Sequence, residues 1–140
     1  MNDAVIAFVL ARDGIWKTGE SRCEDFIFDQ ASGDAGRAHG NVVRGMETLK
    51  ACHDWVIEQL GGLFFLDEII EAKFPRYLSL GEPMRATCTL EKIRRGSGIH
   101  GTIAYFSLVC IRIARPQAVV ARATFKVFWP RVAGPSPTTS

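Results

Sequence analysis

Residues 42–62 read VVRGMETLKACHDWVIEQLGG and carry the longest helical pattern of the chain. Side chains recur there at steps of three and four residues and form one largely apolar face, as in an amphipathic α-helix. The members of this face are Val42, Met46, Leu49, His53, Val56 and Leu60. Gly61-Gly62 follows the last of them, as a glycine C-cap does. Trp55 and Ile57 add apolar surface outside this face, so we predict one long helix that other elements cover.

The chain beyond this helix is predicted to be β-structure. Its segments alternate apolar and polar residues, which is the pattern of strands with one buried face. The clearest alternation is in residues 119–129, whose odd-numbered members are all apolar. The predicted strands are 64–74, 84–93, 99–113 and 119–129, with Pro75 ending the first and turns at 94–98 and 115–117.

The sequence ahead of the helix is less regular. The apolar run 5–10 predicts a strand or a short helix, Asp13-Gly14 predicts a turn, and 23–28 predicts a strand. Residues 32–41 hold three glycines in ten positions, which indicates a loop directly before the helix.

Length and composition describe an ordinary globular chain. At 140 residues, 47% hydrophobic and 23% charged, it has room for one domain with a sizeable core. We predict a single domain over 1–132 and a flexible tail over 133–140. A net charge of +2 is far from the concentrated positive charge of a nucleic-acid binder, so no nucleic-acid partner is expected.

The four cysteines are widely spaced and form no CxxC pair. This spacing matches no zinc or redox motif, so we expect no metal and no cofactor. Three of the four sit among apolar or alternating residues, where a free cysteine acts as a small buried hydrophobe. The N-terminus has no basic residues of a signal peptide, and no apolar run is long enough to span a bilayer. A cytoplasmic protein with no membrane partner is therefore expected.

One helix followed by antiparallel strands buries its apolar face best when the sheet wraps around it. This is the hotdog architecture, an α+β fold. Residues 23–128 resemble hotdog-fold enzymes that act on acyl thioesters of coenzyme A or of acyl carrier protein. The segments that carry the similarity are 42–46 (VVRGM), 72–76 (AKFPR) with 80–82 (LGE), and 90–96 (LEKIRRG) with 121–123 (ARA).

The resemblance is greatest to β-hydroxyacyl carrier-protein dehydratases of the FabZ/FabA type. Those enzymes place a histidine ahead of a glycine that begins the helix, and an acid on the helix. Counted from Gly45, the two positions hold Gly36 and Lys50 here. The nearest residues of the required chemistry are His39 and Glu47, and the resemblance implies them as the catalytic pair. Because Lys50 stands where those enzymes have an acid, an alternative is that the chain is a catalytically incomplete subunit that works with an active hotdog partner.

Two related families are similar in the same loop. Asp34 and His39 match the Asp-x4-His pair of MaoC-like R-specific enoyl-CoA hydratases. Residues 36–41 (GRAHGN), with Glu47 on the helix, look like the histidine loop and helix acid of hotdog thioesterases. All three resemblances meet on His39, with Glu47 and Asp34 as candidate catalytic acids.

The chemistry explains why these residue types matter. A histidine with a nearby carboxylate moves protons in dehydration, whereas a carboxylate such as Glu47 activates water in thioester hydrolysis. Backbone N–H groups of Gly40, Gly45 and Met46 at the predicted helix start are candidates for holding the thioester oxyanion. We expect a β-hydroxyacyl-thioester dehydratase, with a thioesterase as the alternative.

Arginines are candidate ligands for the phosphates of coenzyme A or phosphopantetheine, namely Arg44, Arg94 and Arg95. The Arg94-Arg95 pair also fits a solvated turn. Glu47 is equally a candidate i,i+3 partner of Lys50 on an exposed helix face.

The remaining candidates have structural interpretations as well. His39 also fits a surface or capping residue, and Asp34 fits the acceptor of an Asx-turn. His53 lies on the apolar helix face, which predicts a core histidine with satisfied hydrogen bonds. His100 follows a turn and receives no role.

The long predicted strands favour association, because an unpaired sheet edge is normally covered. The hotdog resemblance implies two sheets paired edge to edge, with the active site between protomers. We expect a homodimer or higher oligomer, or a heterodimer with another hotdog subunit, and an acyl-CoA or acyl-carrier-protein substrate.

Overall fold

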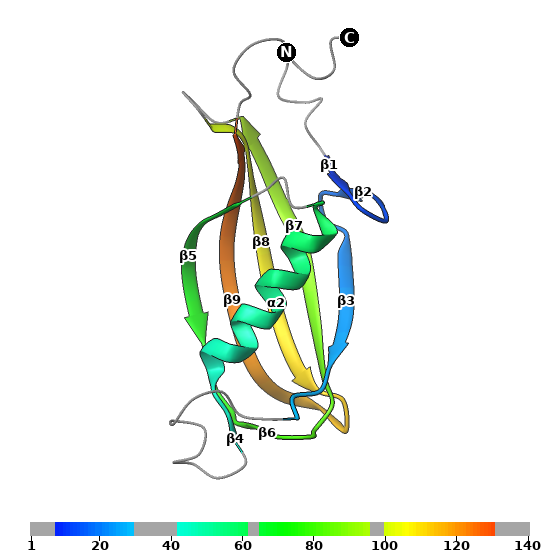
Figure 1. Cartoon of the computed structure of the whole chain (residues 1–140), viewed down its shortest axis with the longest axis vertical. Coiled ribbons are helices and arrows are strands. Elements are labelled where there is room, and N and C mark those ends of the chain that lie inside the picture. The colour runs from blue at the N-terminus through cyan, green and yellow to red at the C-terminus, as the bar shows by residue number, and fades with distance from the viewer. Residues whose placement is uncertain (1–7, 30–41, 62–64, 96–99, 131–140) are drawn as a thin grey trace.

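The computed structural model describes residues 8–29, 42–61, 65–95 and 100–130. In Figure 1 a long antiparallel sheet curves around the helix of these residues. The elements in chain order are β1 (Phe8–Ala11), β2 (Gly14–Lys17), β3 (Ser21–Phe26), β4 (Val42–Val43), α2 (Gly45–Gln59), β5 (Phe65–Lys73), β6 (Leu78–Ser79), β7 (Met84–Arg95), β8 (His100–Arg112) and β9 (Arg115–Pro130).

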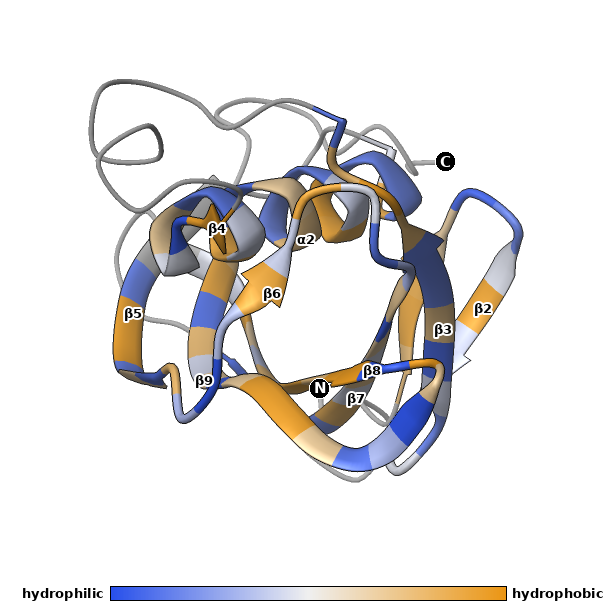
Figure 2. Cartoon of the chain, turned by 90° about the horizontal axis from the view of Figure 1, so that it is seen from below, coloured by the Kyte–Doolittle hydropathy of each residue, from blue (hydrophilic) through white to orange (hydrophobic). Residues whose placement is uncertain are grey.

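The main sheet has five antiparallel strands in the order β3-β7-β8-β9-β5. Figure 2 looks along the sheet from one end and shows these strands following a curve, with α2 across its open side. β-Bulges interrupt the pairing of β7 with β8, of β8 with β9 and of β5 with β9, and bulges increase the local twist that curls a sheet. The predicted arrangement of one helix held within an antiparallel sheet is confirmed.

The core lies between α2 and the concave face of the sheet. Alternate residues of the three longest strands point inward, as the period of two requires. Those that are buried are Met84, Ala86, Cys88 and Leu90 of β7, Ala104, Phe106, Leu108 and Cys110 of β8, and Ala118, Val120, Ala121, Ala123, Phe125 and Val127 of β9. The helix contributes Leu49, Cys52, Trp55 and Val56. The rings of Phe106 and Phe125 stack with their centroids 5.7 Å apart at the centre of this layer.

A hairpin of β1 and β2 closes the core beside the C-terminus of α2. Its Trp16 is fully buried and meets Phe106 edge-on, with the ring centroids 5.1 Å apart. The Arg22 guanidinium lies 4.8 Å above the Trp16 ring and donates a 2.9 Å hydrogen bond to Gln59 Oε1 at the helix end. The turn predicted at Asp13-Gly14 lies one residue earlier, at Arg12-Asp13, and Gly14 begins β2 at φ +120°, a conformation that favours glycine.

Several boundaries differ from the sequence prediction, and the strand expected at 23–28 is β3, which runs two residues earlier. Val42 belongs to β4 and not to the helix, because β4 pairs with β6 and the helix begins only at Gly45. The turn predicted at 115–117 is wrong, since Arg112 already pairs with Arg115 and the chain reverses at residues 113–114. A register shift next to Cys110 also changes the inward alternation near the start of β9.

Other predictions lie wholly or partly outside the described residues. These are the first residues of the 5–10 run, the 32–41 loop, most of the turn at 94–98 and the tail 133–140. Gly61 adopts φ +76° directly after the C-cap Leu60, as predicted for the helix end. No helix within the described ranges has both the length and the apolar character of a membrane span.

Three of the four thiols belong to the layer between helix and sheet. Cys52, Cys88 and Cys110 are fully buried, as predicted, whereas Cys23 is exposed. The Sγ atoms of Cys52 and Cys110 are 3.7 Å apart. The contact with Cys110, together with burial, raises the pKa of the Cys52 thiol, and burial raises the pKa of Cys88. Cys52 and Cys88 are therefore held in their unreactive protonated form.

We predict that Ellman's reagent titrates one thiol of the native protein rapidly and the other three only after denaturation. The reagent reacts only with a thiolate that it can reach, and three of the thiols are buried. A Cys23→Ser variant provides the control and should abolish the rapid phase. More than one rapid thiol in the native protein would contradict the packing of α2 on the sheet.

Candidate functional site

The first turn of α2 lies against the segment that follows β5. A Cβ atom added to Gly45 would lie 2.6 Å from two ring carbons of Phe74, much closer than side chains approach each other. Glycine at this position therefore lets the Phe74 ring pack on the start of the helix. The sequence singled out Gly45 for its backbone N–H, and the structure adds this packing requirement.

The helix start presents backbone donors. Arg44 is the N-cap residue and has no side-chain capping hydrogen bond. Its carbonyl accepts hydrogen bonds of 3.1 Å from the N–H groups of Glu47 and Thr48. The N–H groups of Gly45 and Met46 have no acceptor among the described residues. Within the described ranges they are unpaired donors at the positive end of the helix dipole.

Two adjoining cavities flank this turn. The helix-start pocket has a volume of about 260 Å³ and is lined by Val42, Val43, Arg44, Gly45, Met46, Phe74, Arg76 and Tyr77. The helix–β5 pocket has a volume of about 350 Å³ and is lined by Arg44, Met46, Glu47, Leu49, Lys50, His53 and Ile69. Because Arg44 and Met46 line both, the free N–H groups lie where the two pockets meet. The lining combines apolar side chains with a few polar groups, as small-molecule sites do.

Charged side chains line the helix side of the helix–β5 pocket. Lys50 Nζ is 2.8 Å from Asp54 Oδ2, and Asp54 raises the pKa of Lys50. Lys50 in turn is the main cause of a lowered pKa of Asp54. The predicted ion pair between Lys50 and Glu47 is absent from the described contacts, since Lys50 binds the acid at i+4 instead. The half-buried Glu47 carboxylate is bound to no other described residue and is available within the pocket.

His53 is the residue that sequence reasoning missed. A core histidine with satisfied hydrogen bonds was predicted, but the ring is only half-buried and lines the helix–β5 pocket. Its Nε2 is buried and has no hydrogen-bond partner among the described residues. The signal in the sequence was its place on the face of Met46 and Leu49, directly before the acid Asp54.

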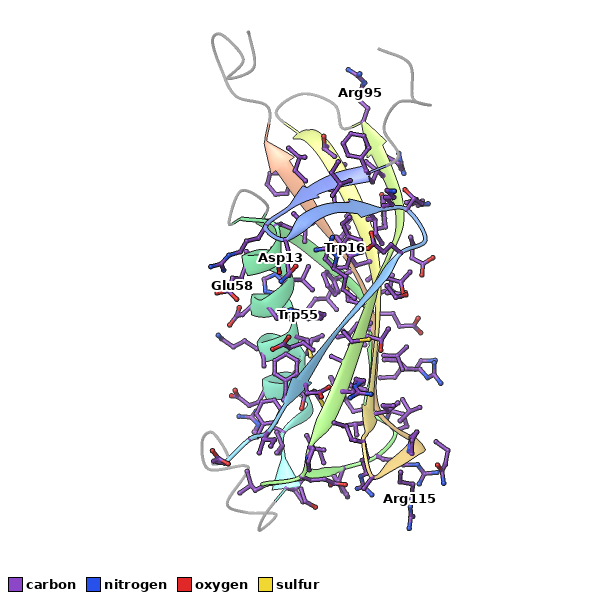
Figure 3. All side chains as sticks on the ribbon, turned by 90° about the vertical axis from the view of Figure 1, so that its right-hand side faces the viewer. Asp13, Trp16, Trp55, Glu58, Arg95 and Arg115 are labelled. Carbon is purple, nitrogen blue, oxygen red and sulfur yellow. The ribbon has the colours of Figure 1, made fainter. Side chains whose placement is uncertain are left out.

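The arginines divide between the two ends of the molecule. Arg44 lies at the two pockets, but Arg94 and Arg95 lie at the end of β7. Figure 3 shows Arg95 at the end of the sheet opposite to Arg115, and Figure 1 places the first turn of α2 near that opposite end. Arg94 donates a 3.3 Å hydrogen bond to the hydroxyl of Tyr105. Among the described residues, Arg76 is the arginine that lines the helix-start pocket together with Arg44, and the sequence analysis had not selected it.

The remaining predicted site residues lie outside the part of the chain that the structure describes. They are His39, Asp34 and Gly40. Among the described residues, no three His, Cys, Asp or Glu side chains are grouped to hold a metal ion.

Comparison with known proteins gives relatives of the fold. No protein-family model matches the chain, and no curated protein sequence matches it. An R-hydratase of Pseudomonas aeruginosa aligns over 96% of this chain and 98% of its own, with a TM-score of 0.62 and 13% identity. A hot-dog-like protein from Thermanaerovibrio acidaminovorans aligns over 81% and 82%, with a TM-score of 0.59 and 16% identity.

A third solved structure is a 1,4-dihydroxy-2-naphthoyl-CoA thioesterase from Synechocystis. It covers 78% of this chain and 81% of its own, with a TM-score of 0.55 and 14% identity. At such identities the similarity concerns the fold, and the predicted hotdog fold is confirmed.

We predict that Gly45→Ala destabilises the protein by about 1 to 3 kcal/mol, because the added methyl overlaps the Phe74 ring. Urea unfolding measures the change. In a Phe74→Ala background the same substitution should cost nothing, since the overlapping ring is gone. An equal loss in both backgrounds would show that the ring contact is not the reason for glycine.

Proposed function

We propose that the chain processes acyl thioesters of coenzyme A or acyl carrier protein, by reversible dehydration of a β-hydroxyacyl thioester. The observation that carries the proposal is the pair of N–H groups of Gly45 and Met46, which have no acceptor among the described residues and lie at the junction of two partly apolar pockets. The fold shared with an R-hydratase and with a CoA thioesterase supports the same substrate class.

The thioester oxygen is the group that these donors fit. Negative charge develops on this oxygen when the α-proton leaves, and two backbone N–H groups at a helix start stabilise it without reorganisation. In this arrangement the acyl chain lies against the apolar lining, and Arg44 and Arg76 meet the substrate phosphates.

Dehydration removes the α-proton and the β-hydroxyl as water and leaves the thioester bond intact. We assign removal of the α-proton to His39, as the family resemblance implies, with Asp34 and Glu47 as the candidate acids that protonate the leaving hydroxyl. Thioester hydrolysis is the second candidate, because the half-buried Glu47 carboxylate lines the pocket and is bound to no other described residue. Such a carboxylate is able to activate a water or attack the carbonyl directly.

The deciding experiment supplies the pure protein with β-hydroxyacyl-CoA, enoyl-CoA and saturated acyl-CoA, and follows enoyl absorbance and free thiol. We predict interconversion of the hydroxyacyl and enoyl forms without thiol release, reduced at least about 100-fold in His39→Ala. Glu58→Gln is the control, since its carboxylate pairs with Arg12 on the exposed surface. Thiol release lost in both His39→Ala and Glu47→Ala would establish the thioesterase instead.

We propose a homodimer that pairs β5 with β5 of a second copy. Among the described strands β5 has a neighbour, β9, on one side only. Exposed apolar side chains gather beside this edge, with Met46 53%, Ile69 38%, Ile70 47% and Phe74 38% exposed. The opposite edge strand, β3, exposes charged residues, which discourage pairing. A second copy at β5 would also cover the helix–β5 pocket.

We predict that Ile70→Lys converts the dimer to a monomer in sedimentation equilibrium, because a lysine placed at the β5 edge opposes burial there. Leu10→Lys is the matched control, as Leu10 is 54% exposed, close to the 47% of Ile70, but belongs to the β1–β2 hairpin. A monomeric wild type, or a dimer that tolerates Ile70→Lys, would contradict this interface. A wild type that reaches the mass of a dimer only after a different hotdog subunit is added would support the heterodimer.

A further inference from the structure

The helix–β5 pocket is a groove that follows one face of α2. Residues at helical spacing line it, namely Met46, Leu49, Lys50 and His53. The groove shares Arg44 and Met46 with the helix-start pocket, so it begins at the N–H groups to which the thioester oxygen is assigned. Val56 and Leu60 continue the same face of the helix, but they are buried and line neither pocket. Among the described residues of α2, the groove therefore ends at His53.

The ring of His53 separates this groove from the core. It lines the groove and also meets Phe125 of β9 edge-on, with the ring centroids 6.1 Å apart and the planes at 67°. Phe125 is fully buried and stacks on Phe106 at 5.7 Å between centroids. Behind the His53 ring lies a close-packed aromatic layer, and such a layer does not admit further carbon atoms without strain.

The charged side chains of the groove leave its lining largely to carbon. Lys50 is exposed, and its Nζ is held by Asp54 at 2.8 Å, so the methylene stem is the part that lines the groove. Glu47 belongs to the first turn of α2, at the thioester end. The other lining residues are Leu49, Ile69 and the His53 ring. A hydrocarbon chain that continues from the thioester is the ligand that this lining fits.

The length of the groove follows from the helix. Met46 and His53 are seven residues apart, which is about 10 Å along the helix axis. An extended chain of single bonds covers about 1.2 Å per bond, as an extended polypeptide does, so about eight bonds fit between the thioester carbonyl and the ring. An octanoyl group has this length, and decanoyl and dodecanoyl groups exceed it.

We propose that His53 sets the acyl-chain length of the substrate, because its ring closes the far end of the groove and leaves no room beyond an octanoyl group. This role rests on the proposed function, which places the thioester at the start of α2. The volume of the ring carries the effect, and its protonation plays no part. A smaller side chain at this position would open the groove onto Phe125 and admit a longer acyl chain.

The test measures binding by calorimetry and needs no turnover. The probes are 2-oxoalkyl-CoA thioethers, which keep the carbonyl oxygen but have neither a thioester bond nor a β-hydroxyl group to react. For the full-length wild type we expect the Kd to fall about fourfold with each added methylene from the butanoyl to the octanoyl chain length. From octanoyl to dodecanoyl we expect no further fall, because the added carbons find no apolar surface to bury.

Three variants separate ring volume from other effects. His53→Ala should bind the decanoyl-length probe at least about fivefold more tightly than the wild type and leave the butanoyl-length probe unchanged. His53→Phe keeps a ring and removes both nitrogens, so it should keep the wild-type limit. It should also fold, because Nε2 has no hydrogen-bond partner among the described residues. Glu58→Gln, on the exposed side of the same helix, should match the wild type throughout. Thermal unfolding checks that each variant is folded.

The wild-type series is decisive even if a variant does not fold. A Kd that keeps falling through the dodecanoyl length, or one that does not depend on length at all, would overturn the role of His53 alone. A folded His53→Ala with the wild-type limit would overturn it too, as would loss of the limit in His53→Phe. A wild type that binds none of the probes would overturn the proposed function and this role with it.

Discussion

The burial of one face of α2 against the concave side of the sheet is the constraint on which the rest of the structure depends. Phe106 and Phe125 form the centre of that contact, with Trp16 closing it from the hairpin side. The three buried thiols fit the same layer because sulfur packs as a small apolar group. Since the sheet must curl to enclose the helix, its strands are long and bulged, and β5 ends as an edge that pairs on one side among the described strands.

The candidate site follows from the same contact. A helix held by one face presents its other residues toward the β5 edge, and there Glu47, Lys50 and His53 line a pocket opposite Ile69. The side chain of Arg44 makes no capping hydrogen bond, and two N–H groups of the first turn have no acceptor among the described residues. Gly45 admits the Phe74 ring, so apolar lining and free backbone donors occur at one place. This combination of donors, apolar surface and titratable groups is what thioester chemistry requires.

Lys50 stands at a position where related dehydratases have an acid, and its contact in the structure is with another acid of the same helix. Its ammonium group binds Asp54 one turn further along. Asp54 in turn contacts His53, so Lys50, Asp54 and His53 form a chain of contacts whose last ring nitrogen has no partner among the described residues. A helix brings residues at i, i+3 and i+4 together, and this proximity gives the arrangement a meaning that linear spacing did not reveal.

The sequence by itself determined the elements whose periodicity is strong. The steps of three and four between Met46 and Leu60 and the alternation from Ala121 to Val127 each leave one way to bury an apolar face, and together they require a sheet around a helix. Only the tertiary structure decided the early start of β9 at Arg115, since bulges change a register without changing composition. It also put the end of β7, which carries Arg94, far from the first turn of α2, and it paired Lys50 with Asp54. Such choices depend on distances between elements, which no local pattern encodes.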